Sequence, residues 1–321
     1  MGTANDLGSL WRVPVMQAPM GPAATPALAV AVAEAGGIGS LGASWAEPDV
    51  LRSQLREIRR GTERPVCVNL VLEFDQEERL EVALAEHVEL ISFSWGVEAR
   101  LVARARAAGA LVVVQAGSPA EARAAVDAGC DAVVAQGVEA GGHVQGEIGV
   151  LALVGELSRT LPVPVLAAGG IADARGVRAA MAVGAVGAMI GTRFLATPEA
   201  DVHPDWAGRL VEASAADTVL TELFDGGWPG APHRVLRNST YVRWDEAGRP
   251  GPGSRPGEGE VVARYGDLEI ERYAADEPRR ETTGELEAMC LYAGQGVGLI
   301  TAIEPAAEIV GRIAAELPRL R

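Results

Sequence analysis

The chain has 321 residues, is 48% hydrophobic and carries a formal net charge of −15 at pH 7. So acidic a surface repels nucleic acids and anionic membranes, and neither is expected as a partner. All 28 basic residues are arginine, which excludes Schiff-base aldolases, pyridoxal phosphate enzymes and Walker-type nucleotide binders, because each needs a lysine.

The three cysteines also exclude some classes of protein. Cys67, Cys130 and Cys290 are far apart and form no CxxC pair, so we expect neither disulfides nor a metal site and place each cysteine in the core. No apolar run approaches the roughly 20 residues that span a bilayer. Residues 1–11 lack the basic start and apolar core of a signal peptide, so a cytoplasmic location is expected.

Short apolar runs alternate with alanine-rich segments along the first two thirds of the chain. The runs predict strands at 13–18, 38–41, 66–71, 90–94, 111–115, 132–136, 163–168 and 186–190. Helices are predicted between them, among others at 26–35, 49–60, 98–108, 119–128, 150–160 and 175–183. Ser118-Pro119 is a typical helix start, and Gly109, Gly129 and Gly184 are typical helix ends.

Strands that are apolar on both faces and alternate with helices indicate a parallel sheet. Eight such strands close a (β/α)8 barrel. We therefore expect an α/β protein built on a TIM barrel, with an open doubly wound sheet as the alternative.

The alternation stops near residue 206. Residues 213–224 look helical, and 248–259 form a Pro/Gly stretch with little scope for regular structure. We expect a barrel over 1–211, a smaller inserted substrate or cap domain over 212–284, and a C-terminal segment, 285–321, that packs back on the barrel. A flexible surface extension is the alternative for the insert.

Glycines and polar residues follow almost every predicted strand. In a TIM barrel these ends meet at one face, where the active site forms. The most informative end is AQGVEAGGH, residues 135–143, where a glycine-rich loop carries a histidine. His143 is our candidate catalytic base, because histidine titrates near neutral pH, and the alternative is a histidine satisfied by surface hydrogen bonds. For His87, His203 and His233 a structural or solvated role is favoured.

The last two strand ends predict a phosphate site. Gly169-Gly170 and Gly191-Thr192 each offer backbone amides after a strand, and loops after strands seven and eight hold phosphate in this fold. With no lysine available, these amides and the Thr192 hydroxyl would hold a phosphorylated cofactor such as FMN. Tight turns alone are the alternative. Arg193 could meet the phosphate or form an ion pair beneath the loop.

Together these motifs resemble the nitronate monooxygenase family, formerly called 2-nitropropane dioxygenases. The resemblance runs over most of the chain. It rests on five motifs in matching order and spacing: QAPM at 17–20, QGVEAGGH at 136–143, AAGGIAD at 167–173, GTRFL at 191–195 and YAGQG at 292–296. It implies a TIM barrel with non-covalent FMN and a substrate domain inserted late in the chain.

The resemblance also implies roles for individual residues. His143 matches the catalytic histidine, which deprotonates a nitroalkane or holds the substrate, and Tyr292 matches a substrate tyrosine. The implied cofactor-binding residues are Ala18, Pro19 and Met20 along the flavin ring, Asn69 and Gln136 as hydrogen-bond partners, Gly141 and Gly142 as close backbone, Ala168, Gly169, Gly170, Gly191 and Thr192 around the phosphate, and Gln295 and Gly296 closing the site. One departure is that family members carry a substrate-site lysine, and this chain has none.

The expected activity is FMN-dependent oxidation of small alkyl nitronates by O2 to a carbonyl compound and nitrite. One alternative is an NAD(P)H-dependent reductase of quinones or enoyl thioesters, since related flavin barrels, including the FabK-type enoyl reductases, share the phosphate motifs. Another is a non-catalytic barrel that binds a phosphorylated ligand. The sequence leaves the oligomeric state open.

Overall fold

A computed structural model describes residues 7–317. Eight parallel strands form its main sheet, in the order β1-β9-β8-β6-β5-β4-β3-β2. Their bounds are β1 Val15–Gln17, β2 Gly39–Gly42, β3 Val66–Val71, β4 Leu90–Ser94, β5 Leu111–Ala116, β6 Ala132–Gln136, β8 Val165–Ala168 and β9 Gly187–Ile190. These strands lie within a residue or two of the predicted ones.

The sheet closes on itself between β1 and β2. Gln17 N donates to Ile38 O at 2.9 Å, and Ile38 N donates to Val15 O at 2.9 Å. The predicted TIM barrel is therefore confirmed, and the open doubly wound sheet is excluded.

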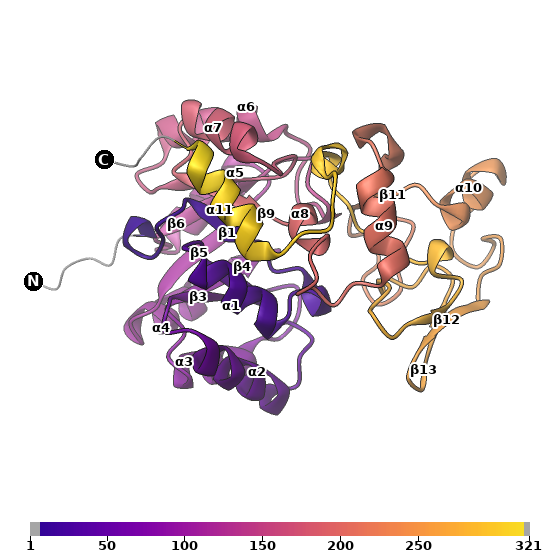
Figure 1. The fold of residues 1–321 in the computed structure, drawn as a ribbon, viewed down its shortest axis with the longest axis horizontal. Coiled ribbons are helices and arrows are strands. Elements are labelled where there is room, and N and C mark those ends of the chain that lie inside the picture. Colours follow the sequence, from indigo (N-terminus) through magenta and orange to yellow (C-terminus); the bar gives the residue numbers. More distant parts are fainter. Residues whose placement is uncertain (1–6, 318–321) are drawn as a thin grey trace, which may run out of the picture.

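Helices cover the outside of the barrel (Figure 1). They are α1 Pro26–Glu34, α2 Pro48–Gly61, α3 Glu77–Ala85, α4 Ala99–Ala107, α5 Pro119–Asp127, α6 Val150–Thr160, α7 Ala174–Ala182 and the short α8 Thr192–Leu195. Several have side-chain caps: Thr25, Ser118 and Asp173 each accept a hydrogen bond from a first-turn backbone N–H.

Strand periodicity divides the core into two layers. In β3, Cys67 points into the barrel interior, whereas Val66, Val68 and Leu70 pack under the helices. Trp11 closes the barrel interior at the N-terminal ends of the strands, where its ring lies close to Gly187. The opposite end of the barrel is left for the site.

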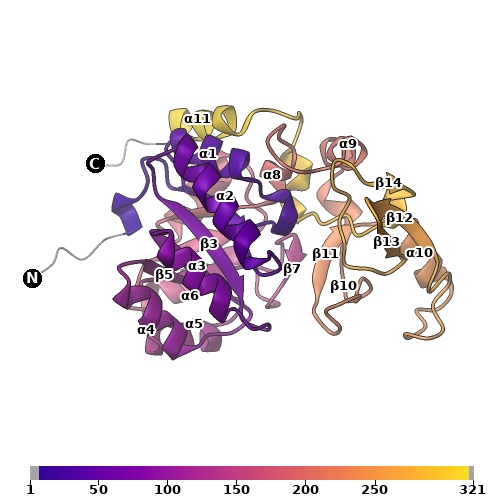
Figure 2. The same cartoon turned by 90° about the horizontal axis from the view of Figure 1, so that it is seen from below.

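The remaining elements form an outlying part beside the barrel (Figures 1 and 2). They are α9 Pro204–Glu212, β10 Thr218–Thr221, β11 His233–Leu236, α10 Ser239–Glu246, β12 Val261–Tyr265, β13 Leu268–Glu271 and β14 Thr283–Gly284. Residues 248–259 contain turns but neither helix nor strand, as predicted. The chain then returns to the barrel, where α11 Ala306–Glu316 packs on α1 and α7.

The predicted helix at 213–224 is wrong. Ser214 and Asp217 form a capping box that closes only one 3-10 turn, Ala215–Asp217. Thr218 to Thr221 then pair antiparallel with β11. Pairing with a distant strand outweighs the local helical pattern here.

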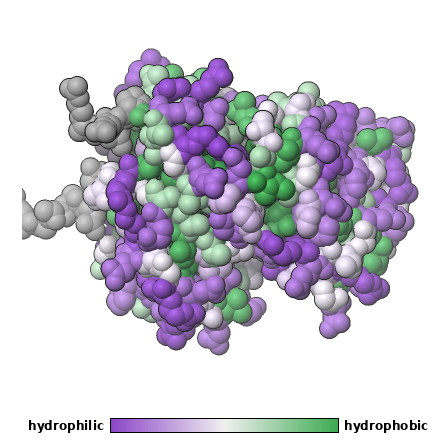
Figure 3. All heavy atoms as spheres, in the orientation of Figure 1, coloured by the Kyte–Doolittle hydropathy of each residue, from purple (hydrophilic) through white to green (hydrophobic). Residues whose placement is uncertain are grey.

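The outlying part shares a sheet with the barrel. In the order β10-β11-β7, strand β7 is Gly142–His143, from the loop after β6. Polar residues cover much of the face drawn in Figure 3, and apolar side chains gather where the barrel meets the outlying part. Among residues 7–317, no helix is long and apolar enough to cross a membrane.

Candidate active site

A cavity of about 530 Å³ lies at the C-terminal ends of the barrel strands, beneath the outlying part. Its lining includes every predicted cofactor residue except Gln295: Ala18, Pro19, Met20, Asn69, Gln136, Gly141, Gly142, Ala168, Gly169, Gly170, Gly191, Thr192 and Gly296. His143 and Tyr292 line it too. Barrel closure thus brings segments from both ends of the sequence to one cavity.

Gln295 is the exception. Its side chain is exposed and does not line the cavity. Its backbone N–H donates to Glu139 O at 2.9 Å. Gln295 therefore supports the histidine loop through a backbone hydrogen bond and not through its side chain.

The loop after β6 is held by side chains from several directions. Gln136 Nε2 donates to His143 O at 3.0 Å, and Gln136 Oε1 accepts from Gln145 N at 2.9 Å. The Glu139 carboxylate accepts from Val150 N, at the start of α6. The guanidinium of Arg234 donates twice to Val138 O, at 3.1 and 2.8 Å. These bonds position His143. The role of Glu139 is to orient the loop by binding the start of α6.

Two glycine loops touch backbone to backbone. A Cβ on Gly141 would lie 2.3 Å from Gly294 N, and a Cβ on Gly294 would lie 2.7 Å from Gly141 N. Gly294 N also donates to Thr192 Oγ1 at 2.9 Å. Only glycine allows this contact, which joins the histidine loop, the residues after β9 and the C-terminal segment.

His143 lies half-buried at the edge of the cavity. Its Nε2 is buried and has no hydrogen-bond partner among residues 7–317. Burial, with a smaller effect of nearby His233, lowers the pKa of His143 to about 3. The imidazole is therefore neutral at physiological pH and keeps a free nitrogen for a ligand.

Aromatic rings surround His143. Trp228 stacks on it with ring centroids 4.2 Å apart and an interplanar angle of 24°. Tyr292 lies 5.6 Å away and donates its hydroxyl to Ala275 O at 3.0 Å. His233 lies 5.3 Å away and is fully buried.

The other predicted residues have structural partners. Asn69 Nδ2 donates to Ser92 Oγ at 3.1 Å, within a buried network. Arg193 pairs with Glu304, so it forms the ion pair beneath the loop. The side chain of His203 caps α9 by accepting from Asp205 N at 3.1 Å.

No metal site is present among residues 7–317, since no cluster of His, Cys, Asp or Glu there could hold an ion. Cys67, Cys130 and Cys290 are free and buried, as predicted. Burial raises the pKa of each thiol, so none is a nucleophile.

Sequence reasoning missed several lining residues, among them three that come from the outlying part. Trp206 is 2% exposed, and its Nε1 has no partner among residues 7–317. Trp228 lies in the turn-rich stretch after β10, and half-buried Glu277 has its pKa raised to about 7 by burial. For Trp206 and Trp228 the only signal was that four of the six tryptophans lie outside the run of predicted strands or at its margins. Glu277 had no signal, since it reaches the cavity through folding of the outlying part.

Comparison with known proteins agrees with this geometry. The family model described as nitronate monooxygenase matches residues 8–79 and 73–316. The chain belongs to the nitronate monooxygenase family. Its resemblance in sequence to that family is therefore confirmed, and membership makes it a flavin-dependent oxidoreductase.

Individual relatives of this family member have different names. A nitronate monooxygenase of Pseudomonas aeruginosa is 33% identical, over 95% of this chain and 96% of that protein. A Mycobacterium tuberculosis protein named (3aS,4S,5R,7aS)-5-hydroxy-7a-methyl-1-oxo-octahydro-1H-indene-4-carboxyl-CoA dehydrogenase is 35% identical over 74% of this chain, and the match spans 66% of that protein, just under two thirds. The structure of FabK from Thermotoga maritima superposes with a TM-score of 0.82 at 37% identity, over 95% of this chain and 93% of that one. Proteins similar to this chain therefore have names that differ in the reaction they indicate.

Proposed function

We propose that this protein oxidises alkyl nitronates with O2, using FMN, and releases a carbonyl compound and nitrite. The observation that carries the proposal is His143, a neutral imidazole with an unpartnered nitrogen at the edge of a cavity built by flavin-type loops. Membership in the nitronate monooxygenase family supports the substrate class. The division into a barrel over 1–211, a cap over 212–284 and a returning segment over 285–321 remains a proposal.

The cavity fits a flavin ring. Two buried polar atoms on its lining residues, His143 Nε2 and Trp206 Nε1, lack partners among residues 7–317. Such atoms cost free energy unless a ligand pairs with them. Ala18, Met20 and Gly141 would flank the ring with backbone and small side chains. The Gln136 amide already holds the histidine loop, so it has one N–H left to offer.

The phosphate end would rely on neutral donors. No arginine lines the cavity. Thr192 Oγ1 accepts from Gly294 N, so the hydroxyl hydrogen is free to donate to a phosphate oxygen. Gly169 and Gly170 have φ values of +108° and +69°, which let their amides face a bound anion closely.

FMN, when bound, supplies the redox chemistry, taking electrons from the substrate and passing them to O2. His143 holds the substrate beside it. Because its pKa is about 3, His143 is a weak proton acceptor but remains able to hydrogen-bond a nitronate oxygen. We infer that the substrate binds as a nitronate already formed, rather than as a nitroalkane that His143 deprotonates.

The test is oxygen uptake by FMN-loaded protein given ethyl nitronate. We expect His143→Ala to lower kcat/KM by about 100-fold, with FMN content unchanged. His203→Ala is the matched control, since His203 caps α9 outside the cavity. No uptake with any alkyl nitronate, short or ring-bearing, would overturn the substrate assignment, and full activity in His143→Ala would overturn the role of His143.

An NAD(P)H-dependent reductase is the second candidate. The likeness to FabK and the name of the Mycobacterium relative favour it. The absence of arginine from the cavity lining opposes it, because a dinucleotide brings further phosphates. Anaerobic mixing of the yellow protein with NADH, NADPH or ethyl nitronate separates the two, since rapid bleaching by a nicotinamide identifies the reductase.

A further inference from the structure

We propose that the substrate carries an uncharged ring, which binds against an aromatic wall formed by Trp45, Phe74, Trp95 and Trp228. This inference deepens the proposed function and rests on it. It names the substrate class as aryl-substituted or fused-ring nitronates, in place of the two- to four-carbon compounds that a small site would take.

The wall is continuous from solvent to His143. Trp45 is 54% exposed, and its ring centroid lies 5.9 Å from that of Phe74. Phe74 lies 5.3 Å from Trp228, which stacks on His143 at 4.2 Å. Trp95 meets Trp228 edge-on at 4.8 Å. All of these residues line the cavity that contains the flavin-type loops.

The wall is assembled from separate parts of the molecule. Trp45, Phe74 and Trp95 lie in the loops that follow β2, β3 and β4, and Trp228 comes from the outlying part. Phe74, Trp95 and Trp228 pack with Val71 and Ala231 in a small apolar cluster, and these rings also line the cavity. Aromatic rings offer large, rigid contact area to a flat ligand at low entropic cost.

The backbone at Trp95 carries strain. Its φ is +57°, in the left-handed region that bulky residues avoid. Gly96, the next residue, has φ +132°. Strain of this kind persists where the surrounding structure holds a side chain in a required place, and here it holds the Trp95 ring against Trp228.

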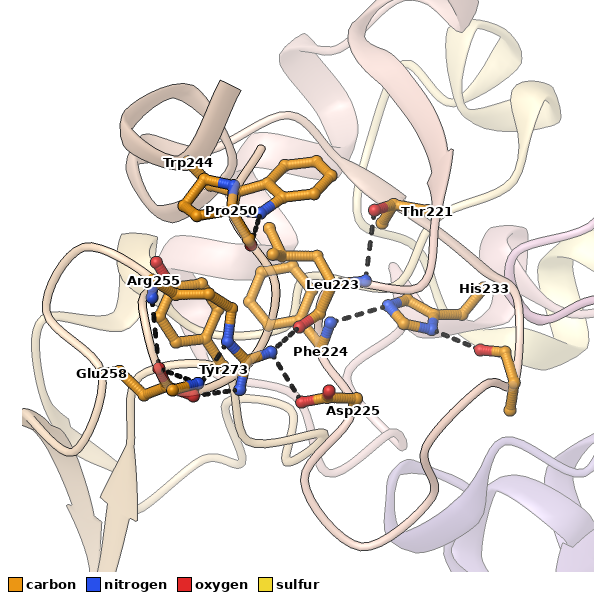
Figure 4. A network of polar contacts seen from close by, with 12 residues as sticks. Thr221, Leu223, Phe224, Asp225, His233, Trp244, Pro250, Arg255, Glu258 and Tyr273 are labelled. Carbon is orange, nitrogen blue, oxygen red and sulfur yellow. Dashed lines mark hydrogen bonds and ion pairs between the residues drawn. The ribbon is translucent and has the colours of Figure 1, made fainter. Parts of the chain in front are cut away.

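The loop that carries Trp228 is anchored at both ends (Figure 4). His233 Nε2 accepts from Phe224 N at 3.2 Å, so its Nδ1 donates to Ala231 O at 2.9 Å. Arg255 pairs with Asp225 at 2.8 Å, and its guanidinium lies 4.4 Å from the Tyr273 ring centroid. Trp228 is therefore positioned without a ligand, and the wall is preformed.

The charged residues that line the cavity indicate that the ring of the substrate is uncharged. The residues that line the cavity include two acids, Asp276 and Glu277, and no arginine. A ring that bears a carboxylate or phosphate would meet these carboxyls and find no cation. The group along the wall is therefore uncharged, and the one negative charge of the substrate is the nitronate itself, beside His143.

The test compares the nitronates of nitroethane, 1-nitro-2-phenylethane and 3-nitropropionate with FMN-loaded enzyme. We expect kcat/KM for the phenyl compound to exceed that for ethyl nitronate at least tenfold, and the carboxylate compound to give no such gain. Trp228→Leu should remove the phenyl preference. Trp244→Leu is the matched control, since Trp244 lies in the outlying part, donates to Pro250 O at 2.9 Å and does not line the cavity.

Phenylacetamide supplies a readout that needs no turnover. We expect it to perturb the flavin spectrum of the wild type and Trp244→Leu at concentrations at least tenfold below those needed in Trp228→Leu, with acetamide inactive. Phe74→Leu gives a second test if Trp228→Leu fails to fold. Equal kcat/KM for phenyl and ethyl nitronates, or no binding of phenylacetamide, would contradict the proposal that the aromatic wall binds the ring of the substrate. If phenylacetamide binds through Trp228 but no nitronate is oxidised, ring binding at the aromatic wall is supported and only the proposed reaction is wrong.

Discussion

At the scale of single residues, the site depends on how His143 is held. Gln136 fixes the backbone at His143 and two residues after it, while Trp228 covers one face of the ring. The stacked Trp228 ring helps to bury the imidazole, and burial favours its neutral form. The same burial that leaves Nε2 free for a ligand therefore also sets the protonation state in which it acts.

This protonation state has a consequence for pH dependence. The pKa of His143 falls from 6.5 to about 3 on folding, so above pH 6.5 it is neutral in both states. As pH decreases from 6.5 towards 3, the unfolded chain takes up a proton that the folded protein refuses. Stability should therefore fall by up to about 1.4 kcal/mol per pH unit from this group.

The measurement is urea unfolding at intervals between pH 4 and 8, in the wild type and in His143→Asn. We expect the free energy of unfolding to change with pH differently in the two proteins only below pH 6.5. The kcat/KM of the wild type should show no inflection from His143 between pH 5 and 8. An inflection near 6.5 that disappears in the variant would contradict a neutral, buried imidazole.

At the scale of elements, glycines allow the two loops of the cofactor side to meet. Gly141 follows β6, and Gly294 lies far along the chain in the segment that returns to the barrel. Their backbones are too close for a Cβ on either residue. The position of the histidine loop is therefore set by the C-terminal segment as much as by the barrel.

Gly294→Ala tests this contact. Its Cβ would lie 2.7 Å from Gly141 N and 2.8 Å from Glu139 O, and backbone cannot give way as a flexible side chain can. We expect FMN affinity to fall at least tenfold, measured by titrating flavin fluorescence into apoprotein. Gly311→Ala is the control: it lies in α11 with nothing within 4 Å of the added Cβ, so affinity should not change and stability should rise slightly. Unchanged affinity in Gly294→Ala would show that the loop contact does not shape the cofactor site.

At the scale of the whole molecule, the sequence predicted those features that arise locally. Each strand and its helix are neighbours along the chain, so the barrel and its strand ends could be predicted, and nearly all of the site residues predicted there do line the cavity. The pairing of β7 with β11, the stacking of Trp228 on His143 and the burial of Trp206 join segments that share no periodicity. The helix predicted at 213–224 failed for the same reason, since its partner strand lies elsewhere in the sequence.

One charged cluster that helps to hold residues 285–317 against the barrel can be tested. Glu304 pairs with Arg193, a buried residue in α8 just after β9, and with Arg312 on α11 at 2.6 Å. Hydrogen bonds from Arg312, with the charge of Arg193, lower the pKa of Glu304 to about 2. Glu304→Gln would leave the Arg193 guanidinium without its counter-charge, so we expect the free energy of unfolding at pH 7 to drop by about 1–3 kcal/mol.

The pH dependence distinguishes this cluster from general packing. Because the folded pKa of Glu304 is depressed, its contribution is complete above about pH 4.5 and is lost as pH falls towards 2. The gap between wild type and Glu304→Gln should therefore close over that range. Glu308→Gln, on the exposed face of the same helix, should leave stability at pH 7 within about 0.5 kcal/mol of the wild type. A gap that stays constant down to pH 2 would mean that the side chain's packing, and not its charge, secures α11 to the barrel.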